Sequence, residues 1–108
     1  MYEQVSIAER AERIVNYNAK RGRKDAGNYL IGKPSAYGYV LKYIFGLRDL
    51  SYQSVSELFG LTPQAINYII NRAGEDYFNE FVIARMCKRL NIDTKYFNEL
   101  VDEVRKII

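Results

Sequence analysis

The four consecutive residues Gly60-Leu61-Thr62-Pro63 constrain the fold of this chain more than any other feature. Glycine commonly ends a helix by adopting a positive φ, and threonine caps a helix start with its hydroxyl oxygen. Proline is favoured at the first position of a helix. One helix is therefore predicted to end at Gly60 and a second to begin after Thr62, so that two helices follow each other with almost no linker.

The residues on both sides of this turn have the periodicity of helices. Ser51 can cap the first helix, and Val55 and Phe59 lie on its apolar face. In the second helix, Ile66 and Ile69 recur at helical spacing and are predicted to pack inward. We expect Ser56 to stand where the two helices cross closely. We expect Leu61 to fill the core from the turn.

Four further helices are predicted around this pair. Their ranges are residues 1–19 with Ser6 as the cap, 35–46 with Ser35 as the cap, about 77–90, and 95–107. No segment alternates as a core strand does, so the fold class is all-α. We divide the chain into an N-terminal helix with a basic, glycine-containing extension (1–35) and a helical domain (36–108).

Composition excludes several function classes. The 108 residues include one cysteine and no histidine. An intrachain disulfide framework, a cysteine-rich zinc site and histidine-dependent nucleophilic catalysis are therefore excluded. We expect a protein that is not an enzyme, with no metal, no cofactor and no evident small-molecule ligand. No signal peptide or membrane-spanning run is recognisable, so we expect a cytoplasmic protein with no membrane contact.

Positive charge is concentrated in the first half of the chain. Residues 1–48 hold nine Lys and Arg against four Asp and Glu, whereas residues 49–108 hold seven against nine. Such asymmetry indicates a polyanionic partner. The basic cluster consists of Lys20, Arg21, Arg23 and Lys24. It can be an arm that contacts DNA phosphates or the minor groove, or it can be a solvated helix end and linker.

The second helix of the central pair is predicted to turn polar side chains outward. These are Gln64, Asn67, Tyr68 and Asn71. Glutamine and asparagine can pair bidentately with adenine in the major groove of double-stranded DNA. A helix N-terminus attracts phosphate, and Ser51 and Thr62 lie at two such termini. The outward-facing residues are therefore predicted to contact DNA bases, and the two cap residues are predicted to contact the DNA backbone.

Residues 38–100 resemble the Cro/C1-type (XRE) helix-turn-helix family of phage repressors. The matching positions are Leu50, Ser51, Ser56, Gly60, Leu61, Thr62 and Ile66. The resemblance implies a five-helix lambda-repressor-like helix-turn-helix bundle, here with an extra N-terminal helix and a basic linker. It also implies a phage or bacterial transcriptional regulator that binds DNA specifically, commonly as a homodimer on an inverted repeat. The family's base-contacting positions correspond to Pro63, Gln64 and Tyr68, and Tyr52 corresponds to a residue that buttresses them or meets a phosphate.

Departures from the family pattern keep a second function open. Pro63 brings no hydrogen-bond donor to a position where polar residues are usual, Ile70 replaces an acidic residue, and the loop at 73–76 is acidic. These features suit a protein-interaction module, such as an inhibitor, adaptor or antitoxin-like partner, that reuses the fold. The apolar faces of the first and last helices can pack within the monomer or form a dimer interface. Cys87 is predicted to be structural.

Overall fold

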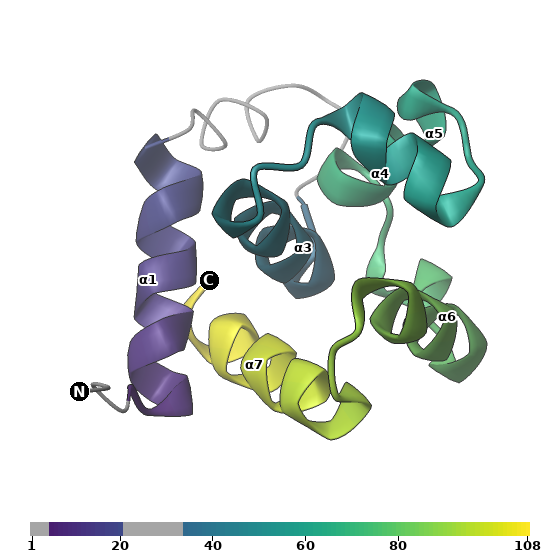
Figure 1. Ribbon diagram of the computed structural model, residues 1–108. Helices are drawn as coiled ribbons and strands as arrows, with labels where there is room; N and C mark the ends of the chain where they lie inside the picture. Colours follow the sequence, from purple (N-terminus) through teal and green to yellow (C-terminus); the bar gives the residue numbers. More distant parts are fainter. Residues whose placement is uncertain (1–4, 21–33) are drawn as a thin grey trace.

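The computed structural model describes residues 5–20 and 34–108, which form six α-helices and one 3-10 helix and contain no strand (Figure 1). In chain order they are α1 (Ile7–Lys20), α3 (Ala36–Leu47), α4 (Tyr52–Phe59), α5 (Pro63–Asn71), η1 (Glu75–Tyr77), α6 (Glu80–Leu90) and α7 (Thr94–Ile107). The all-α prediction is confirmed for this part of the chain. None of the helices within it has the length and apolarity needed to cross a bilayer.

The predicted caps are present. At the start of α1, the Glu9 N–H donates to Ser6 Oγ at 3.1 Å, and the Ser6 N–H donates to the Glu9 carboxylate at 3.2 Å. The side chains of Ser35, Ser51 and Thr62 each accept from a backbone N–H three residues later. Each bond satisfies a donor that has no partner within its helix, so these side chains determine where the helices begin.

The predicted start of the helix at about 77–90 is wrong. This helix begins at Glu80 rather than near Tyr77, because Asn79 caps it by accepting from the Val82 N–H at 3.0 Å. The preceding residues form η1, and Phe78 is buried. In the sequence, either Asp93 or Thr94 can open the last helix. In the structure Asp93 is the cap, and the helix begins at Thr94.

The N-terminal helix α1 packs against α7 and α3 (Figure 1). Ala11 and Ile14 are fully enclosed. Asn18 is also buried, and its amide donates to the carbonyl oxygens of Ile14 at 2.8 Å and Tyr39 at 3.2 Å. These two bonds offset the cost of burying an amide. The apolar faces of α1 and α7 therefore pack within the chain.

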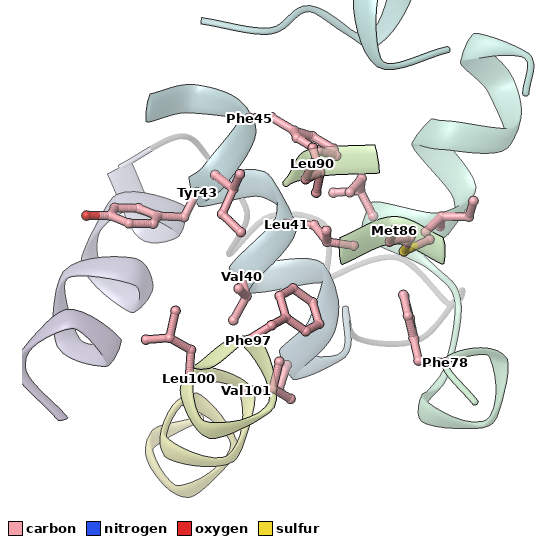
Figure 2. Packing of buried hydrophobic residues seen from close by; sticks show 14 of the residues in the cluster. Val40, Leu41, Tyr43, Phe45, Phe78, Met86, Leu90, Phe97, Leu100 and Val101 are labelled. Carbon is pink, nitrogen blue, oxygen red and sulfur yellow. The ribbon is translucent and has the colours of Figure 1, made fainter. Parts of the chain in front are cut away.

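Helix α3 lies at the centre of the fold and contacts α1, α5 and α7. Val40 and Leu41 on α3 are fully buried. In Figure 2, Phe97 and Leu100 on α7 approach α3 from one side, and Met86 lies on the other side. The core thus connects α1 and α7 to the α4–α5 pair through α3.

Cys87 is buried within this core, as predicted. Burial raises the pKa of its thiol, because an apolar surrounding disfavours the thiolate, whereas a hydrogen bond with Thr94 lowers it. The stability contributed by the neutral thiol is present below the pKa of the unfolded chain. It is lost as pH rises through the higher pKa of the folded state.

We expect this thiol to react slowly in the folded protein. Because the chain has one cysteine, a disulfide reagent such as DTNB reports on Cys87 alone. The rate at mildly alkaline pH should be about 100-fold lower than in urea, since the reagent needs an exposed thiolate. Equal rates in the two conditions would contradict the burial.

Candidate nucleic-acid interface

The turn between α4 and α5 is held by Ser56. Gly60 has a φ of +70° and its N–H donates to the Ser56 carbonyl at 2.9 Å. The Leu61 N–H donates to the same carbonyl at 3.1 Å, and the Ser56 hydroxyl donates back to the Leu61 carbonyl. The buried serine hydroxyl is therefore satisfied, and the start of α5 is tied to the end of α4.

Leu61 does not fill the core. Its side chain is 38% exposed, and it lines a shallow groove with Phe59, Val82 and Met86. The expectation of an inward-facing turn residue is wrong because the hydrogen bonds to Ser56 involve the backbone of Leu61 and do not require its side chain to point inward. The turn therefore adds an exposed apolar group to the surface.

The positive φ at Gly60 predicts a measurable cost of substitution. No atom lies within 4 Å of a Cβ placed there, so Gly60→Ala meets no clash and only the backbone strain remains. We expect the free energy of unfolding to fall by about 1 kcal/mol. Gly60→Asn should cost less, because asparagine tolerates this conformation, as Asn91 does at a φ of +56°. Urea denaturation measures the free energy of unfolding of both variants. A Gly60→Ala variant as stable as the unmodified chain would contradict the strained turn.

Helix α5 has one buried and one exposed face. Ile66, Ile69 and Ile70 are buried, and α5 packs against α3 and α4. Gln64 and Asn67 are exposed, and Tyr68 is 52% exposed. The structure therefore presents two amide side chains and one phenol together on the solvent side of a single helix.

Asn71 is half-buried and engaged with its neighbours. Its amide donates to Asn67 Oδ1 at 2.7 Å and to the Asn67 carbonyl at 3.2 Å, and it lies 3.4 Å from the Tyr52 hydroxyl of α4. Asn71 thus holds the side chain of Asn67 in place, and Tyr52 contacts Asn71 in turn. The spacing of four residues between the two asparagines is the sequence signal for this contact.

The residues predicted to contact the DNA backbone fall into two groups. Ser51 and Thr62 are exposed at the N-termini of α4 and α5. The basic cluster lies largely outside the described residues, since Lys20 ends α1 and Arg21, Arg23 and Lys24 follow it. The DNA contacts of this cluster therefore stay a prediction from the sequence.

Two features near the end of α5 were not predicted: a cation at Arg72 beside the site, and the ion pairs that balance the acidic loop. Arg72 is exposed at the C-terminal cap of α5 and adds a cation beside the polar face. In the acidic loop, the Glu75 carboxylate pairs with Arg105 at 2.7 Å. Arg105 also pairs with Asp102 at 2.6 Å. Part of the negative charge of the loop is thus balanced by α7.

Comparison with known proteins provides no family assignment. No family model, curated protein or solved structure matches this chain. Within residues 5–20 and 34–108, no group of three or more metal-binding side chains occurs. The functional proposal therefore depends on the geometry of α4 and α5.

Proposed function

We propose that this chain binds double-stranded DNA sequence-specifically, with α5 in the major groove. The observation that carries the proposal is the exposed face of Gln64, Asn67 and Tyr68 on a helix whose opposite face is buried. A rigid helix with outward amides has the shape and the hydrogen-bonding groups that major-groove recognition requires. In this account α4 and α5 form a helix-turn-helix within a lambda-repressor-like bundle, and α1 is an addition to it.

Each group on this face has a distinct role in the proposal. Gln64 and Asn67 pair with adenine edges, and Tyr68 contacts a thymine methyl group or donates to a phosphate. Asn71 acts mainly by positioning Asn67, to which it donates at 2.7 Å. Pro63 begins α5 and offers no donor. Specificity therefore depends on Gln64, Asn67 and Tyr68 rather than on the first residue of α5.

The phosphate contacts complete the proposal. Ser51, Tyr52 and Thr62 lie at the two helix starts, where backbone N–H groups attract phosphate oxygens. The basic cluster supplies further contacts that strengthen binding to every sequence alike. From the resemblance to phage repressors we infer a phage or bacterial transcriptional regulator that acts as a homodimer and reads an inverted repeat.

In vitro selection from a random duplex pool tests this function. We expect the purified chain to enrich a short motif, and a dimer would enrich two half-sites about one helical turn apart. The binding constant for the enriched duplex should fall steeply as salt concentration rises. Absence of enrichment at low salt, with no retardation of genomic fragments, would contradict the proposal.

A second function is favoured by one specific observation. Phe81 on α6 is 82% exposed, and Val82, the next residue, lines with Leu61 a groove with a volume of about 90 Å³. Exposed aromatic groups of this kind are frequent in protein interfaces. A protein-interaction module would retain its partner when Gln64 and Asn67 are replaced and would lose it on Phe81→Ser. Pull-down of a stoichiometric protein, combined with a negative DNA selection, would favour this alternative.

A further inference from the structure

A cleft lies where α1, the end of α3 and the beginning of α7 meet. Its volume is about 160 Å³, and its lining includes Arg10 from α1, Leu47 and Arg48 from the end of α3, and Ile92 and Phe97 from the α7 side. Tyr43, Phe97 and Leu100 also line the cleft. In Figure 2, Phe97 and Leu100 lie between α3 and α7, and the ring of Tyr43 points from α3 toward α1. Most of the lining is therefore apolar, with two guanidinium groups.

Neither of these two arginines is neutralised by a carboxylate of the described residues. Arg10 Nε is enclosed and has no hydrogen-bond acceptor there. Arg48 donates to the Leu90 carbonyl, which carries no net charge. Arg105, by contrast, binds two carboxylates at 2.6–2.7 Å. Arg10 and Arg48 therefore leave two positive charges unbalanced beside an apolar cleft.

This combination defines the chemistry of a ligand. Guanidinium groups bind carboxylates through charge-assisted hydrogen bonds, and an apolar lining favours a hydrocarbon body. A cavity of about 150 Å³ accommodates a molecule the size of benzene. A DNA phosphate would satisfy the arginines but would leave the apolar lining unfilled.

We propose that this cleft is a binding site for a small carboxylate with an apolar body, such as a short-chain aliphatic or an aromatic acid. The carboxylate lies against Arg10 and Arg48, and its body lies against Leu47, Ile92 and Phe97. The site is separate from the exposed face of α5 and does not depend on the proposed DNA binding. No sequence motif predicts it, because the residues are brought together only by the packing of α1 against α3 and α7.

Titration of the ¹⁵N-labelled chain with hexanoate tests the site. We expect saturable shifts of the backbone amide signals of Arg10, Leu47, Arg48 and Ile92. Hexanamide has the hydrocarbon chain of hexanoate without its negative charge. Acetate and inorganic phosphate have a negative charge without that chain. Each should bind about tenfold more weakly than hexanoate, because it satisfies only half of the site.

Variants identify the group that holds the charge. Arg10→Gln should weaken hexanoate binding about tenfold and leave hexanamide binding unchanged. Arg85→Gln, on the exposed side of α6 and outside this cleft, is the matched control and should leave both unchanged. Leu47 is 62% exposed, so Leu47→Glu should fold and should weaken hexanoate by adding a competing carboxylate at the cleft.

Several results would overturn the proposal. They are the absence of saturable shifts with hexanoate, shifts confined to residues away from the cleft, and acetate or phosphate binding as tightly as hexanoate. Unchanged hexanoate affinity in Arg10→Gln would also overturn it. If circular dichroism shows that Arg10→Gln does not fold, the hexanoate affinity of Leu47→Glu decides instead, and an unchanged affinity of that variant would overturn the proposal.

Discussion

Replacing Gly38 by alanine is expected to lower the free energy of unfolding by about 2–3 kcal/mol, because the added methyl group would overpack a helix crossing. Gly38 lies on α3 where α5 crosses it, and a Cβ placed there would be 2.2 Å from the carbonyl oxygen of Ile70. That oxygen belongs to the backbone and cannot turn away as a side chain can. The two helices must separate, and the loss exceeds the gain of about 1 kcal/mol that alanine brings to a helix.

Two other glycines serve as controls for this prediction. The nearest atoms to a Cβ at Gly46 are the hydroxyl and two ring carbons of the Tyr17 side chain, and a side chain can shift more easily than backbone, so Gly46→Ala should cost less than Gly38→Ala. A Cβ at Gly74 meets nothing within 4 Å, so Gly74→Ala should change stability by less than about 0.5 kcal/mol. Urea denaturation gives all three values. Equal stability of the Gly38→Ala and Gly74→Ala variants would contradict the close packing of α3 and α5.

Replacing Gln64 by alanine is expected to remove discrimination at one base pair of the selected DNA site, by about 1–3 kcal/mol. Gln64 is exposed near the start of α5, and its side-chain amide is the only group of that residue that can read a base edge. Affinity for unrelated DNA and the slope of affinity against salt concentration should stay unchanged, because the phosphate contacts remain. Competition between the selected duplex and its single-base-pair variants measures the discrimination.

Asn16→Ala is the matched control for this substitution. Asn16 is an exposed amide on α1, a different helix from α5, so its removal should leave both affinity and discrimination unchanged. A uniform loss of affinity in Gln64→Ala, equal for all duplexes, would show that Gln64 contacts the backbone instead. Unchanged discrimination at every position would contradict its role as a base-reading residue.

Local chemistry accounts for the parts of the fold that were predictable. Ser35, Ser51 and Thr62 cap the helices that they were predicted to cap, because capping depends on a side chain and a backbone N–H three residues away. Gly60 adopts the expected positive φ for a similarly local reason. The α4–α5 pair and the exposed face of α5 could therefore be predicted from residues close together in the sequence.

Contacts between residues far apart in the sequence account for the parts of the fold and site that could not be predicted. The sequence did not distinguish a partner-facing α1 from one packed within the chain, since this depends on how α1 meets α7 and α3. The pairing of Glu75 with Arg105, 30 residues away, has no local signature. The same holds for Arg10 and Arg48, which share a cleft only after three helices pack together. The exposure of Leu61 could not be predicted either, because its hydrogen bonds to Ser56 involve only its backbone.

The central claim is that the exposed face of α5 binds DNA, and titration of the ¹⁵N-labelled chain with the selected duplex tests it most directly. We predict that the largest shifts occur in the backbone and side-chain amides of Gln64 and Asn67 and in the backbone amides at the start of α4. The amides on the exposed side of α6 should shift little. Binding of the duplex with unchanged α5 signals and with large shifts on α6 would contradict the claim.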